Sequence, residues 1–154
     1  MSDPDIRQVL REFLETQSTL ALATVNAEGH PETAPVFYVS DDQFNLYWLS
    51  GTSVAHSVNL SAHTQVSGSV CPAVWQWEDI VGLQIRGEAQ AISDERIREQ
   101  ILLIYLRKFQ LPPSFDYMIA SSTLYVLRPT WLRWVNNSVS FGHKVELDLT
   151  EKQS

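Results

Sequence analysis

The sequence is poor in cysteine and in positive charge. Its one cysteine, Cys71, excludes an internal disulfide and a metal site made of several cysteines, and its apolar neighbours predict a small buried side chain. Eighteen acidic residues against 11 basic ones give a net charge of −7, and no cluster of Lys and Arg occurs. Because affinity for phosphate backbones needs such clusters, a nucleic-acid partner is not expected.

Long apolar runs and common catalytic motifs are also missing. No run approaches the ~20 residues of a membrane-spanning helix, and the first residues lack the charged and apolar parts of a signal peptide. We therefore expect a cytoplasmic protein that does not enter a membrane. The motifs G-x-S-x-G, H-E-x-x-H, G-x-G-x-x-G and the P-loop are absent, and the four histidines are too far apart in sequence for a local metal pair.

The sequence does contain enough apolar surface for one core. Hydrophobic residues make up 44% of the chain and charged residues 19%. We expect a single domain over residues 1–148 and a loose tail over residues 149–154. Five tryptophans are many for this length, and tryptophan is often found at interfaces and ligand sites, where one edge of the ring reaches a polar partner.

Apolar periodicity predicts two substantial helices, a short helix and about six strands. The first helix has one apolar face from Ile6 to Leu14, after a cap at Ser2 or Asp3. The second spans about residues 94–109 with Ser93 as its cap. The short helix lies within residues 50–63, with Val54 and Val58, and with them Ala55 and Leu60, as the candidates to face inward. The predicted strands cover residues 19–25, 32–39, 44–49, 65–71, 80–92 and 124–135, and residues 141–147 are a candidate for a further strand.

The turns between these strands favour an antiparallel barrel over a parallel sheet. The clearest turn is Asn26–Gly29, where the glycine can adopt a positive φ without a steric cost.

Two segments are more apolar than a half-exposed element needs. Residues 36–39, Val-Phe-Tyr-Val, break the alternation of a surface hairpin strand. This indicates a strand covered on both faces, by a barrel core on one and by a second chain or a flat bound molecule on the other. Residues 101–106, Ile-Leu-Leu-Ile-Tyr-Leu, are apolar nearly all round, which predicts a helix buried on more than one side.

Two further segments are candidates for a binding site. Residues 50–53 place three hydroxyl groups and a glycine between a strand end and a helix start, where free N–H groups attract an anion. The alternative is simple helix capping by Thr52 or Ser53. Near the C-terminus, Trp131 and Trp134 are three residues apart, so on a strand they point to opposite faces and at least one leaves the core.

The order of four of these pieces resembles that of one family. They are LATVNAEGHPETAPVFYV (22–39), LYWLS (46–50), HSVNLSAHTQVSGSV (56–70) and GLQIRGEA (82–89), and they resemble the pyridoxamine 5′-phosphate oxidase-like family of FMN-binding split barrels. The likeness covers roughly residues 8–147, and the segments VAHSV, IRGEA and SVSFGHK are most similar to its YhbP-like branch. The resemblance implies a mainly β, six-stranded antiparallel Greek-key split barrel with flanking α-helices. It also implies a homodimer with two flavin sites at the subunit interface.

The resemblance further implies which residues hold the cofactor. One strand runs beside the isoalloxazine ring, the next lies near the ribityl chain, and the hydroxyl segment lies near the phosphate. From the second subunit, the loop over residues 136–144 closes over the flavin, where Lys144 or His143 supplies a positive charge. The implied cofactor-binding residues are Pro35, Val36, Phe37, Tyr38, Tyr47, Trp48, Ser50, Thr52, Ser53, His56, Trp134 and Lys144.

One position departs from the family's pattern. The family places a lysine in the helix entry, and counting back from Asn59 this position holds His56, a weaker phosphate partner when neutral. A second phosphate-binding set for pyridoxamine phosphate is not found. The leading hypothesis is therefore an FMN-dependent oxidoreductase with an unknown small-molecule substrate, in which the cofactor supplies the chemistry. The alternatives are a haem-binding barrel with His56 or His143 as axial ligand, a deazaflavin-binding barrel, and a cofactor-free dimeric binding protein without catalysis.

Overall fold

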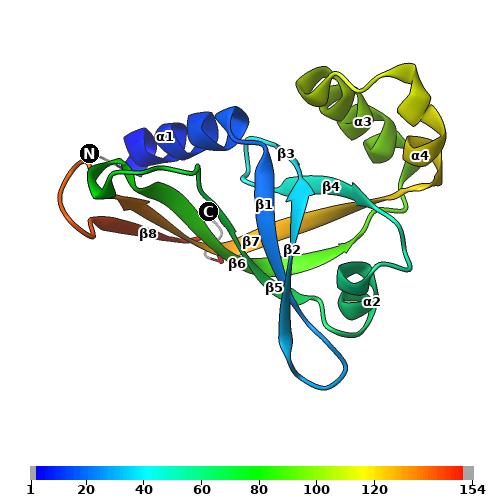
Figure 1. Cartoon of the computed structure of the whole chain (residues 1–154), viewed down its shortest axis with the longest axis horizontal. Coiled ribbons are helices and arrows are strands. Elements are labelled where there is room, and N and C mark those ends of the chain that lie inside the picture. The colour runs from blue at the N-terminus through cyan, green and yellow to red at the C-terminus, as the bar shows by residue number, and fades with distance from the viewer. Residues whose placement is uncertain (1–2, 151–154) are drawn as a thin grey trace.

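The computed structural model describes the backbone of residues 3–150 and the side chains of residues 5–150. One antiparallel sheet of eight strands dominates it, in the order β2-β1-β5-β6-β7-β4-β3, with β8 paired to β7. The sheet curls, and helices flank it (Figure 1). Within the described residues, no helix is long and apolar enough to span a bilayer. The strands are β1 (Thr19–Val25), β2 (Pro31–Phe37), β3 (Val39–Ser40), β4 (Leu46–Ser50), β5 (Gln65–Val70), β6 (Val81–Ala91), β7 (Thr123–Asn136) and β8 (Lys144–Asp148). The helices are α1 (Asp3–Thr16), α2 (Ala55–Ala62), α3 (Glu95–Phe109) and α4 (Asp116–Ser121), with 3₁₀ turns η1 (Trp77–Asp79) and η2 (Pro113–Phe115).

The mainly β barrel architecture expected from the sequence is confirmed, with eight strands in place of the six predicted ones and the candidate seventh. The predicted strand over residues 32–39 divides, because the chain leaves β2 at Phe37 and β3 begins at Val39. The candidate strand over residues 141–147 is found as β8, which begins three residues later and pairs with β7 near the C-terminus. Helix α4, which the sequence did not predict, follows the two prolines 112 and 113. Beyond β8, Leu149 donates its N–H to Thr130 O and packs against the core.

Helix α1 packs on the barrel core through the face that the sequence predicted. Ile6, Leu10 and Leu14 are at most 4% exposed. The Tyr38 hydroxyl donates to Leu14 O at 2.7 Å, which gives a carbonyl near the helix C-terminus a buried partner. The predicted cap at Ser2 or Asp3 lies outside the described side chains.

The β1–β2 hairpin turns at Gly29, which has φ +83°, as the sequence predicted. Helix α2 packs on this hairpin with a different face from the predicted one. Val54 and Val58 are 40% and 51% exposed and Ala55 is exposed, so their predicted inward orientation is wrong, whereas that of Leu60, which is 4% exposed, is confirmed. The inward positions belong to Ser57, Asn59 and Leu60, because the Asn59 amide donates to the hydroxyl of Thr24 and to the carboxylate of Glu32 on the hairpin.

Strands β6 and β7 form the longest ladder of the sheet. The sequence alternation places Leu83, Ile85, Gly87, Ala89 and Ala91 on one face of β6; the first four point into the barrel, whereas Ala91, the last residue of the strand, and the residues between them are exposed. The ladder is irregular between Arg86 and Gly87, where a side chain on Gly87 would overlap the backbone carbonyl of Arg128. Strand β7 pairs with β6 along one edge, and its other edge pairs with β4 at one end and β8 at the other.

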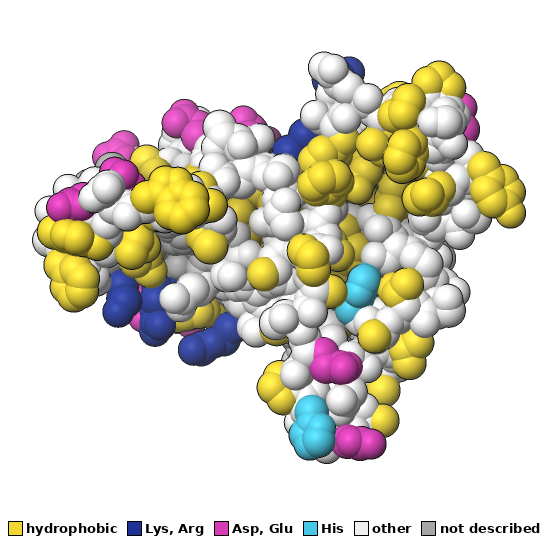
Figure 2. Space-filling model, viewed as in Figure 1, with side chains coloured by type: hydrophobic (Ala, Val, Ile, Leu, Met, Phe, Trp, Pro, Cys, Tyr) yellow, Lys and Arg dark blue, Asp and Glu magenta, His cyan; other side chains and the backbone are white. Residues whose placement is uncertain are grey.

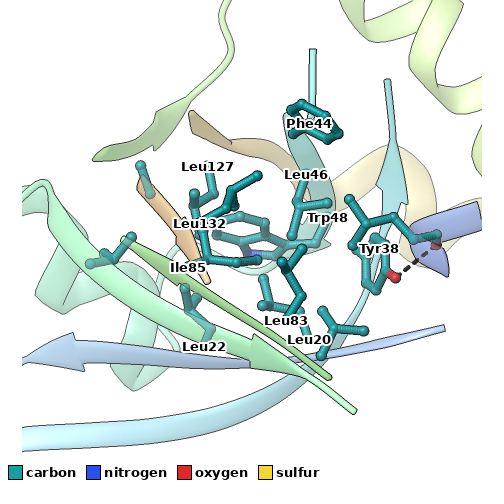
Figure 3. Close-up of a cluster of buried hydrophobic side chains, with 14 of the residues drawn as sticks. Leu20, Leu22, Tyr38, Phe44, Leu46, Trp48, Leu83, Ile85, Leu127 and Leu132 are labelled. Carbon is teal, nitrogen blue, oxygen red and sulfur yellow. Dashed lines mark hydrogen bonds between the residues drawn. The ribbon is translucent and has the colours of Figure 1, made fainter. Parts of the chain in front are cut away.

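The barrel interior is filled by large apolar side chains from strands on all sides (Figure 3). Trp48, Leu20, Leu22 and Ile85 are all at most 1% exposed within this cluster. The indole N–H of Trp48 has no hydrogen-bond partner among the described residues, although it is buried.

A second apolar cluster lies between α3 and the sheet. Ile101 and Tyr105 of α3 pack there against Val39 of β3, Tyr47 of β4 and Val126 of β7. The helix begins at an Asp94 cap, whose carboxylate accepts the N–H groups of residues 96 and 97, so the predicted Ser93 cap is wrong.

Helix α3 also explains part of the apolar run at residues 36–39. Val36 and Tyr38 face the barrel core, whereas Val39 lies in the second cluster. The ring of Phe37 stacks on Phe109 of α3, with centroids 4.6 Å apart, and stays 51% exposed. The other face of this run is therefore covered first by a helix of the same chain.

Helix α3 is itself only partly covered. Leu103 and Ile104 remain 66% and 45% exposed, so within one chain the predicted burial on more than one side is wrong. Cys71 is also exposed, against the prediction of a buried thiol, because it follows the last pair of the β5–β6 ladder at Val70.

Candidate cofactor site

The hydroxyl segment after β4 brings two of the predicted site residues into contact. Ser50 Oγ and His56 Nε2 lie 2.8 Å apart, which ties the end of β4 to the first turn of α2. Burial lowers the pKa of the His56 imidazole, so the ring is neutral near pH 7. A neutral imidazole can accept from or donate to Ser50, and it carries no positive charge toward an anion.

Helix α2 begins without a side-chain cap. Its N-cap residue is Val54, which makes no side-chain hydrogen bond to the helix, so the predicted capping by Thr52 or Ser53 is wrong. Both of these hydroxyl residues are exposed. In the first turn, Ser57 is 4% exposed and its hydroxyl has no partner among the described residues. The helix start therefore offers amide and hydroxyl donors to a ligand, and a buried hydroxyl among them is unsatisfied.

The predicted ring-binding strand presents its backbone at the edge of the sheet. Strand β2 is the last strand in the sheet order, with β1 on its one paired side. Pro35 and Phe37 are exposed, whereas Val36 and Tyr38 point into the core. Burial raises the pKa of the Tyr38 phenol well above its usual value, so its hydroxyl stays protonated as the donor to Leu14. Of these four residues, Pro35 and Phe37 are the ones whose side chains reach the surface.

The two aromatic residues of β4 face opposite sides of the strand. Trp48 lies in the barrel core and stacks on Tyr125, with centroids 5.8 Å apart. Tyr47 lies under α3, and its hydroxyl donates to Asp41 Oδ2 at 2.9 Å. Burial, with this hydrogen bond, raises the pKa of Tyr47 to about 12. Any contact of either residue with a cofactor in this conformation is therefore made mainly through the backbone.

The last predicted site residues lie at the other end of the barrel, near the turn between β7 and β8. Trp134 is 5% exposed and packs edge-on against Phe13 of α1, with centroids 4.8 Å apart. Lys144 begins β8 and is exposed. Trp131 lies on the outer face with the Arg86 guanidinium 4.0 Å above its ring, which confirms that one of the two tryptophans leaves the core. One chain thus does not bring Trp134 and Lys144 together with Ser50 and His56.

Sequence reasoning missed Lys108, near the C-terminal end of α3. Its ammonium group is buried over the ring of Tyr38 at 4.4 Å, and it has no hydrogen-bond partner among the described residues. Burial lowers the pKa of Lys108 to about 8, although Glu15 acts in the opposite direction. In sequence it reads as an ordinary basic residue in a last helical turn, so no local signal marks its burial.

A cavity of about 520 Å³ lies on another part of the sheet. Its lining includes Ser67, Arg86, Glu88 and Thr130, and it contains none of the predicted cofactor residues. The described residues also include no group of three His, Cys, Asp or Glu side chains placed to hold a metal ion.

A curled antiparallel sheet with flanking helices and a donor-rich strand-to-helix junction defines a protein of the split-barrel class. Residues 6–136 match the family model described as pyridoxamine 5′-phosphate oxidase. The chain therefore belongs to the pyridoxamine 5′-phosphate oxidase-like family, as the sequence motifs indicated. The UPF0306 protein YE0465 of Yersinia enterocolitica is 28% identical over 99% of this chain and 100% of its own length, which confirms the expected YhbP-like branch.

Solved structures show the same fold at lower identity. ChuZ of Campylobacter jejuni is 18% identical, with a TM-score of 0.81, and the match covers 96% of this chain. The same match covers about 61% of the longer ChuZ chain. HutZ, the heme storage protein of Vibrio cholerae, is 22% identical, with a TM-score of 0.67 over 82% of this chain and 89% of HutZ.

Proposed function

We propose that this protein binds flavin mononucleotide at the interface of a homodimer and acts as an oxidoreductase on a small organic molecule. The family match over residues 6–136 supports the flavin, and the junction between β4 and α2 carries the proposal. Bound FMN would supply the hydride or electron transfer, and the protein would orient it and exclude water.

The β4–α2 junction fits the phosphate end of the cofactor. An uncapped helix start and the exposed hydroxyls at Thr52 and Ser53 are donors that a phosphate dianion accepts. His56 is neutral, so the site relies on hydrogen bonds instead of a fixed charge. We therefore expect FMN affinity to be modest in comparison with a site that contains a lysine.

The ring end fits the edge of the sheet. The outer edge of β2 leaves backbone groups free to bond a flat heterocycle, and Phe37 presents an exposed aromatic face beside them. The loop over residues 136–144 lies at the opposite end of the chain, so it would cover the ring only from a second subunit, in a two-fold arrangement that makes two equal sites.

Haem is a second candidate, favoured by the state of His56. A neutral, half-buried imidazole is the form that coordinates iron, and HutZ of the same fold is a heme storage protein. His56 Nε2 already contacts Ser50 Oγ at 2.8 Å, so coordination through this atom would require that hydrogen bond to break.

Parallel titrations with FMN, riboflavin and hemin test both candidates. For the wild type we expect saturable quenching of flavin fluorescence at one FMN per chain. A charged hydrogen bond contributes about 1.5–3 kcal/mol, so Ser50→Ala and Thr52→Ala should each weaken FMN binding about tenfold or more. Riboflavin, which lacks the phosphate, should bind equally to wild type and variants. Ser61→Ala is the matched control, because this hydroxyl lies in the last turn of α2 and bonds Val58 O.

The outcomes separate the candidates. No FMN binding at about 100 μM, which corresponds to a free energy weaker than roughly −5.5 kcal/mol, contradicts the flavin proposal. A Soret band that appears with hemin and is lost in His56→Ala would assign the site to haem. If the Ser50→Ala and Thr52→Ala variants lose as much affinity for riboflavin as for FMN, the phosphate does not bind at the β4–α2 junction.

A further inference from the structure

Five exposed apolar side chains gather on two neighbouring loops at one end of the barrel. They belong to the loop over residues 71–80 and the turn over residues 137–143, which lie together at the left end of Figure 1. Trp77 and Phe141 touch edge to face, with centroids 5.8 Å apart. We call this group the aromatic platform; its members are Trp75 (92% exposed), Trp77 (53%), Ile80 (43%), Val139 (62%) and Phe141 (80%).

Asn137 fastens the two loops of the platform together. It is 7% exposed, and its backbone N–H donates to Ile80 O at 2.9 Å. Its side-chain amide donates to Trp77 O at 3.0 Å and accepts from the N–H of Gly142 at 3.0 Å. Gly142 has φ +71°, which a residue with a side chain rarely adopts. The loops are therefore held in one arrangement before any partner arrives, which lowers the entropic cost of binding.

A second apolar surface lies at the opposite end of the same chain. Figure 2 shows hydrophobic side chains gathered at the left end and again over α3 and α4 at the upper right. Helix α3 carries four basic and two acidic residues in a chain of net charge −7, whereas the platform carries Glu78 and Asp79 of η1. We call the second group the α3–α4 surface; it consists of Ile97, Leu103, Ile104, Leu106, Tyr117 and Met118, all 37% exposed or more.

We propose that the aromatic platform of one chain docks on the α3–α4 surface of a second copy, and that Asn137 is the residue that positions it. Aromatic side chains offer about 150–250 Å² each, so the exposed parts of Trp75, Trp77 and Phe141 present roughly 450 Å². In a two-fold pair each chain contributes both surfaces. The area that each chain buries then reaches the roughly 800 Å² per partner of a standard interface. This inference rests on the proposed homodimer and names its contact residues.

Sedimentation equilibrium of the full chain, without and with added FMN, tests the proposal. We expect the wild type to be a dimer at micromolar concentration. Trp77→Ala, Phe141→Ala, Leu103→Asp and Asn137→Ala should each raise the dimer dissociation constant at least tenfold, because every substitution occurs twice in the pair. Asn26→Ala is the matched control, since the Asn26 side chain also holds a turn together, by accepting the N–H groups of Glu28 and His30, but in the β1–β2 hairpin outside both surfaces. Far-UV circular dichroism and the melting temperature show whether each variant is folded.

Each result decides one claim. A wild type that stays monomeric at 100 μM overturns both this inference and the interfacial flavin site. A dimer that is unaffected by Trp77→Ala and Phe141→Ala overturns the inference and leaves the proposed flavin function standing. A dimer that weakens as expected but binds no FMN upholds the inference and refutes the function. If the two platform variants weaken the dimer and Leu103→Asp does not, the proposed docking on the α3–α4 surface is refuted.

Discussion

Replacing Lys108 by methionine should stabilise the protein at neutral pH. The ammonium group is buried without a hydrogen-bond partner among the described residues, and its pKa falls from 10.5 to about 8. At ~1.4 kcal/mol per pKa unit this shift sets a ceiling of roughly 3 kcal/mol. The side chain keeps some solvent contact, and the Tyr38 ring at 4.4 Å returns about 0.5–1 kcal/mol. We therefore expect Lys108→Met, which keeps the length and apolar stem, to gain about 1–2 kcal/mol.

The gain should depend on pH in a defined direction. Between pH 8 and 10.5 the unfolded chain holds a proton on Lys108 that the folded chain has released, so the stability of the wild type rises with pH across this window. Below about pH 8 both states are protonated and the full cost of burying the charge is present. The difference between variant and wild type should therefore be largest at pH 7.5 and shrink toward pH 10.

Urea unfolding followed by tryptophan fluorescence measures this difference. Ionisation of the tyrosines above pH 10 makes both proteins less stable. Because both proteins contain the same tyrosines, this contribution cancels in the stability difference between them. Arg107→Met is the matched control, because this neighbouring cation is exposed and its removal should leave no pH-dependent gain. A variant that is less stable than the wild type at pH 7.5, or a difference that is constant from pH 7.5 to 10, would refute the reasoning.

Three further substitutions test other parts of the structure. His56→Lys should tighten FMN binding at least tenfold by adding a charge beside the phosphate; an unchanged dissociation constant in a fluorescence titration would contradict the phosphate's proposed position. Gly87→Ala should lower the free energy of unfolding in urea by at least about 2 kcal/mol, because the added methyl group would overlap a β7 carbonyl. Gly51→Ala is the control: its methyl group would have no atom closer than 4.0 Å, so it should cost under about 1 kcal/mol. Tyr38→Phe should cost about 1–2 kcal/mol through the lost bond to Leu14 O, and an unchanged melting temperature would show that α1 is held by packing alone.

The elements that were predicted best from the sequence are those that bury one apolar face and expose the other. The apolar face of α1 and the alternation along β6 each follow from a single buried side, and both are confirmed. The buried face of helix α2 was predicted wrongly apart from Leu60, because polar contacts decide which of its faces is buried. Asn59 is drawn inward by Thr24 and Glu32, residues 27 and more positions away in sequence, and Val58 is left outside.

The candidate site was predictable as a set of segments but not as a set of side chains. Ser50 and His56 are six residues apart at the junction of one strand and one helix; the family resemblance placed both at the phosphate, and the structure brings them into contact. Trp48 and Trp134 sit in segments where apolar residues occupy both faces, so the sequence could not tell which side chains enter the core. Lys108 meets Tyr38 only through the tertiary packing of α3.

Strand β7 sets the distance between the two ends of the molecule. Its 14 residues extend over roughly 45 Å at ~3.3 Å per residue, with β4 held at one end and β8 at the other. An insertion or deletion of one residue in its middle would exchange inward and outward side chains on one half of the strand. It would also change the spacing between the β4–α2 junction and the turn before β8 in every copy. We therefore expect length variation to be tolerated in the loops and excluded from this strand, because in the proposed dimer one span sets the geometry of both sites.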